Sequence, residues 1–184
     1  MASESILTTD SLASSTVLSS AKAAEQFLRF QLVPEIAALL PISQLIEVLT
    51  IPVGQITPIP QIPAWVMGAY NWRGEVLWMI DLPHLIGFTP WHQQGMSATY
   101  TAVVLRVCSR NTLDTNAGNQ QMIGLVINRA EMIEWCDPDL LESPSSDVVA
   151  PQLVPFLRGY QLKSNGERLA VLDDEFIVSA ISQL

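Results

Sequence analysis

The sequence predicts an all-β fold made of two related halves that share an interface. From Glu25 onward, short apolar segments with a two-residue alternation are separated by Pro and Gly, as in a barrel or sandwich. One group of residues also recurs later in the chain. A length of 184 residues allows either one sizeable core or two small ones, and the recurrence favours two.

The recurring unit is expected to form a strand, a tight turn, a second strand and a helix start. Its first copy contains Pro63, Gly68, Gly74, Glu75 and Asp81, and its second copy, about ninety residues later, contains Pro155, Gly159, Gly166, Glu167 and Asp173. The second turn contains Asn-Gly, which is common in tight hairpins, whereas the first contains Trp72 and Arg73. A turn with a purely structural role needs neither, so we expect these two residues to contact a partner.

In the first half, the pattern predicts strands over residues 28–32, 37–42 and 45–51 and a hairpin over residues 65–82. Glu47 lies in the third strand among aliphatic residues. Four prolines before the hairpin keep the chain extended and irregular. Asp81 is expected to cap a short helix that ends at Gly87.

In the second half, strands are predicted over residues 98–108, 121–127 and 130–135, followed by the second hairpin. Residues 109–120 are expected to form an exposed loop. Residues 1–24 are expected to form a flexible tail, because they contain too little apolar surface to offset the entropy of ordering; the alternative for residues 10–24 is a short helix that serves as a tether. Asp173 or Asp174 should cap a terminal amphipathic helix. Its apolar stripe is formed by Phe176, Ile177, Ala180, Ile181 and Leu184.

The charge balance argues against nucleic acid and anionic lipid as partners. Nine basic and eighteen acidic residues give a net charge of −9, so phosphate contacts would work against the mean field. No apolar run is long enough to insert into a membrane, and two distant cysteines fit a reducing cytoplasm. The acidic stretch after Arg129 is either a solvated rim or a docking surface for a basic partner.

An enzyme would need convergent titratable groups, and the sequence offers few. The candidates for a small β-barrel enzyme or ligand-binding protein are Glu75, Asp81 and His84, but Glu75 and Asp81 lie six residues apart on one strand, about 20 Å at strand rise. Asp81 is better explained as a helix cap. We expect no metal, because neither His84 nor His92 has ligands at suitable spacing, and no cofactor, because no phosphate-binding loop is present.

Several motifs together resemble the CheW-like chemotaxis adaptor domain over residues 25–184. They are Phe27-Leu-Arg-Phe-Gln-Leu, Leu45-Ile-Glu-Val, Pro60-x-x-Pro-x-x-Val-x-Gly, Asn71-Trp-Arg-Gly, Ile80-Asp-Leu and Gly124-Leu-Val-Ile-Asn. The pairing of Asn-x-Arg-Gly with hydrophobic-Asp-Leu at this spacing is the most specific of them. The resemblance implies two intertwined five-stranded SH3-like barrels that share a core.

The resemblance also implies a non-enzymatic scaffold that couples a methyl-accepting chemoreceptor to a CheA-type histidine kinase. The residues matching the receptor-binding groove are Leu45, Glu47, Val48, Arg73, Leu125, Ile127 and Ile133, with Gly124 to Ile133 expected to form a strand pair along one side. Arg73 also matches an arginine implicated in kinase coupling, and we expect the kinase contact to use Trp72, Arg73 and exposed apolar edges of the first barrel. The chain departs from the family at Ile127-Asn128-Arg129-Ala130, which adds a cation and removes an acid. Its Trp-rich, Ser-rich character resembles cyanobacterial phototaxis or pilus-motility versions.

Overall fold

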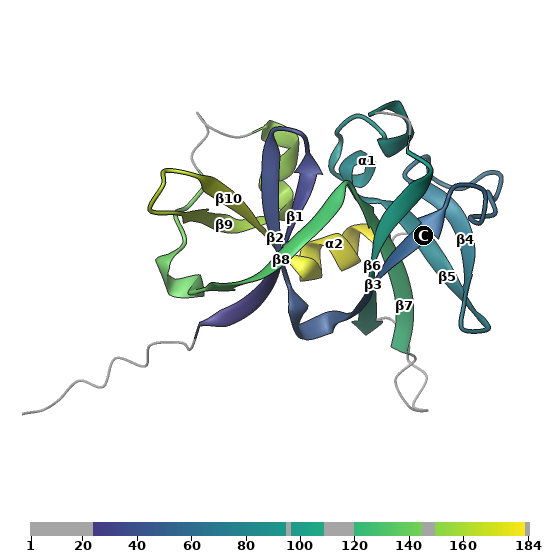
Figure 1. Cartoon of the computed structure of the whole chain (residues 1–184), viewed down its shortest axis with the longest axis horizontal. Helices are drawn as coiled ribbons and strands as arrows, with labels where there is room; N and C mark the ends of the chain where they lie inside the picture. The colour runs from purple at the N-terminus through teal and green to yellow at the C-terminus, as the bar shows by residue number, and fades with distance from the viewer. Residues whose placement is uncertain (1–23, 95–96, 109–119, 145–149, 183–184) are drawn as a thin grey trace, which may run out of the picture.

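The computed structural model describes residues 24–94, 97–108, 120–144 and 150–182. Two five-stranded sheets lie side by side, and the C-terminal helix packs between them (Figure 1). Three expectations fall outside the described residues: the tail over residues 1–23, the loop over residues 109–119 and the place of Leu184 in the apolar stripe. Among those described, no helix is long and apolar enough to cross a bilayer.

The strands of both sheets follow closely from the predicted segments. The first sheet, here called sheet A, contains β1 (Glu25–Val33), β2 (Ile36–Pro41), β8 (Arg129–Cys136), β9 (Leu157–Leu162) and β10 (Arg168–Leu172). Sheet B contains β3 (Leu45–Pro52), β4 (Val66–Trp72), β5 (Glu75–Asp81), β6 (Thr99–Cys108) and β7 (Gln120–Ile127). The described residues also form two short α-helices, α1 (Leu82–Ile86) and α2 (Asp174–Ile181), and short 3-10 helices over Ile42–Gln44, Trp91–Gln93, Pro138–Leu140 and Pro151–Phe156.

The two sheets have the same plan. Sheet A has the order β8-β1-β2-β10-β9, and sheet B has the order β3-β6-β7-β5-β4. In each, the third and fourth strands of that order pair in parallel and all other neighbours pair antiparallel. This match confirms that the repeated sequence unit reflects a repeated structure.

The halves are intertwined rather than consecutive. β1 and β2 are the first two strands of the N-terminal half of the chain, but they belong to sheet A, whose other strands come from the C-terminal half. Likewise, β6 and β7 are the first two strands of the C-terminal half, but they belong to sheet B with β3, β4 and β5 of the N-terminal half. The chain therefore crosses between sheets at Asn128, so the expected strand pair over residues 124–133 is wrong: β7 and β8 lie in different sheets.

Side-chain alternation divides the interior into one shared core and two smaller ones. On β1, Leu28 and Phe30 enter the shared core while Phe27 enters a cluster belonging to sheet A. On β6, Val103 enters the shared core while Val104 enters a cluster belonging to sheet B. Because the strands bury both faces, each sheet curves around its own cluster and packs against the other through the shared one.

Neither sheet closes into a continuous barrel of paired strands within the described residues. Instead, each first edge strand runs on into a residue that bridges the opposite edge strand by two backbone hydrogen bonds. Thr57, after β3, bridges Ala69 of β4, and Glu142, after β8, bridges Tyr160 of β9. The structure therefore confirms two five-stranded sheets. The expected closed barrels are not observed, because only one isolated bridge joins the two edges of each sheet in the part of the chain that the structure describes.

Both helices begin at the aspartates of the repeated unit. Asp81 accepts a hydrogen bond from the backbone of His84, and Asp173 accepts from the backbone of Glu175 and Phe176, as N-caps do. Gly87 ends α1 in the left-handed conformation, as expected. In α2 the predicted apolar stripe is only partly correct, because Phe176 is exposed and Ile177 is buried.

Candidate functional site

The β4–β5 turn holds Arg73 in a conformation that arginine rarely adopts. Arg73 has φ +54° and Gly74 has φ +88°, and the flanking Trp72 and Glu75 are paired across the hairpin. Two consecutive positive φ values are those of a type I′ turn, whose first central position favours Asn, Asp or Gly. An arginine there is an observed backbone outlier, and such outliers concentrate at functional sites.

Three side chains form the candidate site at this turn, here called the arginine turn: Glu47, Trp72 and Arg73. Glu47 lies on β3, and the other two come from the end of β4 and the turn, so the site joins the two edge strands of sheet B. Arg73 Nη2 donates to Glu47 Oε2 at 2.6 Å. The Trp72 indole N–H donates to Glu47 Oε1, and Arg73 Cζ lies 4.9 Å from the Trp72 ring centroid.

Arg73 is paired but not enclosed. Its side chain is 66% exposed, against 27% for Glu47. An ion pair this exposed is screened by solvent and contributes little to stability. The geometry therefore presents the guanidinium at the surface while fixing one of its edges on Glu47.

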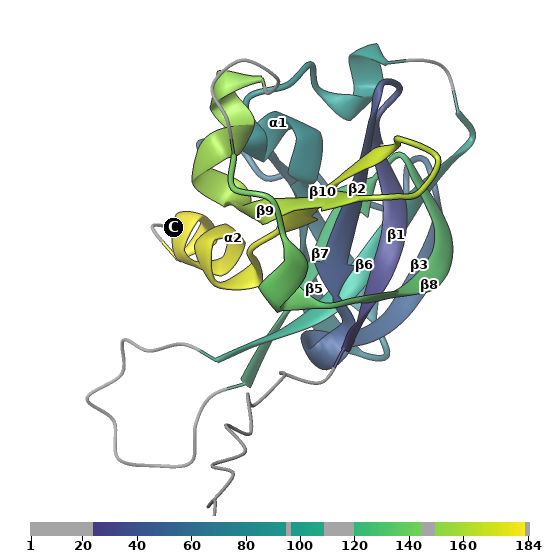
Figure 2. The same ribbon diagram turned by 90° about the vertical axis from the view of Figure 1, so that its left-hand side faces the viewer.

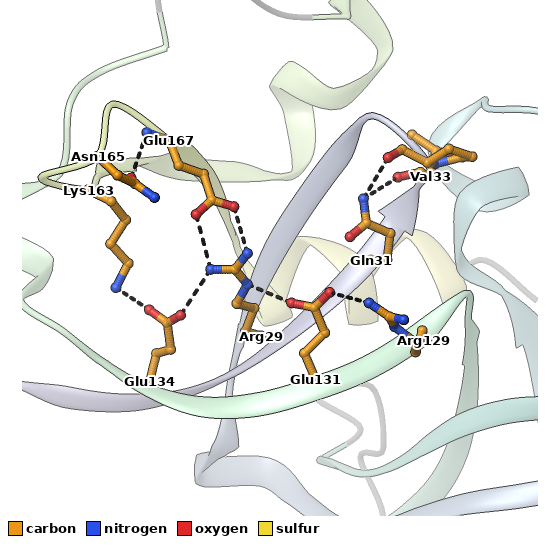
Figure 3. A network of polar contacts seen from close by, with 10 residues as sticks. Arg29, Gln31, Val33, Arg129, Glu131, Glu134, Lys163, Asn165 and Glu167 are labelled. Carbon is orange, nitrogen blue, oxygen red and sulfur yellow. Dashed lines mark hydrogen bonds and ion pairs between the residues drawn. The ribbon is translucent and has the colours of Figure 1, made fainter.

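Sheet A has a different arrangement at the matching place, where β8 approaches the β9–β10 hairpin. Figure 3 shows Arg29 surrounded by three glutamates. We call this cluster the ion network; its members are Arg29, Glu131, Glu134, Glu167, Lys163 and Arg129. Arg29 Nε donates to Glu131 at 2.7 Å, Nη1 to Glu134 at 3.2 Å, and Nη2 to Glu167 at 2.6 Å. Lys163 pairs with Glu134, and Arg129 pairs with Glu131.

The ion network holds its charges in the ionised state. Partial burial acts to raise the pKa of Glu134, but hydrogen bonds from Lys163 and Arg29 outweigh it, so this pKa lies below its ordinary value. Glu131 behaves in the same way through Arg129 and Arg29. Burial opposes the charge of Arg29, yet the hydrogen bonds that it donates to its glutamates raise its pKa above the ordinary value. The network joins β1, β8 and the hairpin, and its central Arg29 side chain is only 19% exposed.

The remaining residues matched to a receptor-binding groove fall into two groups. Val48 is 42% exposed and Ile133 is 49% exposed, and Leu45 is half-buried. Leu125 and Ile127 have no exposed surface, because they belong to the shared core. A partner cannot reach them, and their assignment as contact residues is wrong.

Trp72 also differs from expectation. It was predicted at the surface beside Arg73, but its side chain is only 9% exposed and packs in the sheet B cluster with Leu77 and Met79. Its place at the end of a strand, not in the turn itself, explains this burial. Trp72 is therefore corrected from a contact residue to a buried neighbour of the arginine turn.

The alternative enzyme site does not assemble. Asp81 is 2% exposed, and its two oxygens accept the backbone N–H groups of His84 and Trp91. Burial raises the pKa of Asp81, although these hydrogen bonds oppose the shift. Glu75 is exposed at the other end of β5. The three proposed groups do not converge, and within the described residues no three His, Cys, Asp or Glu side chains form a metal-binding group.

Sequence reasoning missed the ion network. Arg29 lies 102 residues before Glu131 and 138 before Glu167, so no local spacing reveals the contacts. One signal was available: Arg29 follows Phe27 by two residues on β1, so the two side chains share a face, and a charged residue on a buried face requires partners.

Two intertwined five-stranded sheets with equivalent strand arrangements define a duplicated β-sheet domain. A model of the CheW-like domain family matches residues 26–182, and the chain belongs to that family. Among solved structures, the scaffolding protein TtCheW from Thermoanaerobacter tengcongensis is similar at TM-score 0.61 and 21% identity, covering 82% of this chain and 89% of that chain. At this identity the likeness supports the fold alone. No curated protein matches the chain.

Proposed function

We propose that this protein is a non-enzymatic cytoplasmic adaptor that couples a methyl-accepting chemoreceptor to a CheA-type histidine kinase. Its membership of the CheW-like family supports a chemotaxis scaffold in general. The coupling is geometric: simultaneous binding fixes where the kinase sits relative to the receptor, and no bond is made or broken. The composition of the turn and the first residues favours a phototaxis or pilus-motility system.

The observation that carries the proposal is the arginine turn. An exposed arginine with a left-handed backbone costs folding free energy, since Asn or Gly would fit the turn without strain. The exposed ion pair to Glu47 returns little of that cost. A strained, exposed and partly oriented cation is explained if it contacts another protein.

The proposed contact surface lies mainly on sheet B. Leu45, Glu47, Val48 and Arg73 would contact the receptor, and Ile133 of sheet A would contribute from β8. Arg73 would also contact the kinase, together with exposed apolar side chains at the edges of the sheets. Val48, Ile133 and the side chain of Arg73 supply accessible surface of the kind that protein interfaces use.

Co-elution tests this proposal. The purified chain is mixed with the regulatory domain of a CheA-type kinase and the cytoplasmic tip of a methyl-accepting chemoreceptor from the same organism, and the mixture is run on a sizing column. We expect one complex containing all three proteins, reduced by Arg73→Ala but not by Arg106→Ala. Arg106 is a suitable control because it is an exposed arginine on β6 of the same sheet. Separate elution of the wild-type chain from both partners would overturn the proposal.

A further inference from the structure

We infer that Trp72 is a positioning residue of the arginine turn, which holds the Arg73 guanidinium ready for a hydrogen-bond acceptor, a carboxylate or backbone carbonyl, on the partner. The inference rests on the proposed function and assigns a role to a side chain that the partner cannot reach. Trp72 acts through two other residues, Glu47 and Arg73.

The indole of Trp72 is fixed before any partner arrives. It is 9% exposed and packs against the sheet B cluster, which includes the fully buried Met79 and Val104. A side chain packed in this way keeps one rotamer. Its N–H and its ring face therefore have defined directions, and both are in use.

The N–H of Trp72 orients the carboxylate of Glu47. It donates to Glu47 Oε1, which leaves Oε2 to receive Arg73 Nη2 at 2.6 Å. With each carboxylate oxygen held by a different donor, the plane of the carboxylate cannot rotate freely. This matters because Glu47 is only half-buried and would otherwise sample several rotamers.

The ring of Trp72 supports the guanidinium itself. Arg73 Cζ lies 4.9 Å from the ring centroid, within the range of a cation–π contact. Within the described residues, the interaction with Glu47 uses Nη2 alone, so Nε and Nη1 stay open to an acceptor. The exposed arginine thus loses much of its rotational freedom in the unbound protein.

Preorganisation of this kind raises affinity without adding a contact. A free arginine side chain must be ordered when it binds, and that entropy cost subtracts from affinity. Held by Glu47 and Trp72, the guanidinium can form charge-assisted hydrogen bonds with the partner at a smaller cost. A buried tryptophan with a purely structural role would instead affect partner binding only by destabilising the fold.

The decisive variant is Trp72→Phe, which removes the N–H donor and keeps an aromatic ring in the core. Titration with the chemoreceptor tip should show about three- to tenfold weaker binding. The same change made in a chain that already carries both Glu47→Ala and Arg73→Ala should cause no further loss, because both residues that Trp72 positions are already gone. Trp78→Phe, on the same hairpin but packed in the shared core, should leave affinity unchanged.

Nuclear magnetic resonance of the free protein tests positioning without any partner. In the wild-type chain, nitrogen-15 relaxation of the Arg73 Nε–H group should show restricted fast motion, and this motion should increase in both Trp72→Phe and Glu47→Gln. An equal affinity loss from Trp72→Phe in both backgrounds, or unchanged Arg73 relaxation in both variants, would overturn the inference. If the wild-type chain fails to bind the tip, the proposed function fails, and the Arg73 relaxation alone decides whether Trp72 positions the guanidinium.

Discussion

The β4–β5 and β9–β10 hairpins contain the two copies of the repeated sequence unit and occupy equivalent places in their sheets, yet their turns have different chemistry. At the first, Arg73 is exposed, strained and paired with one glutamate. At the second, the chain turns through Gly166 with an ordinary backbone at Asn165, and Lys163 and Glu167 join the ion network. The first hairpin presents the Arg73 guanidinium to solvent, whereas the charged side chains of the second pair with Arg29 and Glu134 of the same sheet.

This difference separates stability from function within a duplicated fold. Figure 2 shows the sheet A side, where β8 passes the β9–β10 hairpin and the ion network links them. Sheet B has no comparable network at its matching position among the described residues, and only the arginine turn connects β3 with the end of β4 there. Substitutions in the network should therefore change stability, whereas substitutions at the arginine turn should change binding.

The largest expected loss of stability comes from substituting the two glycines that lie against the bridging residues Thr57 and Glu142. A Cβ at Gly68 would lie 2.1 Å from Thr57 O, at φ +138°, so Gly68→Ala should lower the free energy of unfolding by roughly 3–4 kcal/mol. At Gly159 a Cβ would lie 2.8 Å from Glu142 O with no positive φ, and Gly159→Ala should cost about half as much. Urea unfolding measures both; equal losses would show that the two bridges are equivalent.

The next effect concerns the ion network. Arg29→Ala leaves Glu131, Glu134 and Glu167 close together without their shared cation. We expect a loss of about 2–3 kcal/mol, less than for a fully buried pair because 19% of the Arg29 side chain is exposed. Arg29→Lys keeps the charge but loses the forked geometry, so it should fall between wild type and alanine. A loss of only about 0.5 kcal/mol, the size expected for an exposed ion pair such as the one at the arginine turn, would contradict the division between the two hairpins.

The pH dependence of stability should also report the ion network. The pKa values of Glu131 and Glu134 are lowered by folding, so the unfolded chain binds more protons as the pH falls below their ordinary value of 4.5. The network's stabilisation is thus present above that pH and is lost as the pH falls through the folded-state pKa.

The matching experiment compares wild type with Glu134→Gln in urea at several pH values. Their difference should be about 1–2 kcal/mol at pH 7 and should shrink towards pH 3. The raised pKa of Asp81 changes stability with pH in the opposite direction. Because Asp81 is present in both chains, its contribution cancels in the difference between them. A difference that stays constant over this range would show that ionisation of Glu134 is not the source of the stabilisation.

The smallest effect on stability should come from the arginine turn. Arg73→Asn supplies the Asn-Gly pair that a type I′ turn prefers, while removing one exposed ion pair. The melting temperature should stay the same or rise slightly, by the equivalent of about 0.5 kcal/mol. A clear drop in the melting temperature would mean that Arg73 stabilises the fold, contrary to this account.

The sequence predicted local elements well because their signals are local. Alternation located the strands, and Asp81 with Gly87 located α1. It could not predict which strands pair, since alternation shows that a face is buried and not which strand lies beside it. The exchange of β1 and β2 into sheet A, and the burial of Leu125 and Ile127, follow from pairing between distant segments.

The candidate site was predictable in part. The unusual residue at the turn tip identified Arg73, but the role of Glu47 depended on where β3 runs relative to β4. A register shift between Leu45 and Glu47 also interrupts the alternation on β3, so the simple face assignment for this strand changes there. The contact of Trp72 with Glu47 could not be seen before the two edge strands were placed together.

Titration of the chemoreceptor tip into the wild-type chain and into Arg73→Asn tests the central claim most directly, with the melting temperature of each recorded in the same buffer. We expect at least tenfold weaker binding by the variant together with an unchanged or higher melting temperature. Equal affinity for the two chains, or a loss of affinity accompanied by a matching loss of stability, would contradict the claim that the exposed arginine serves binding and not the fold.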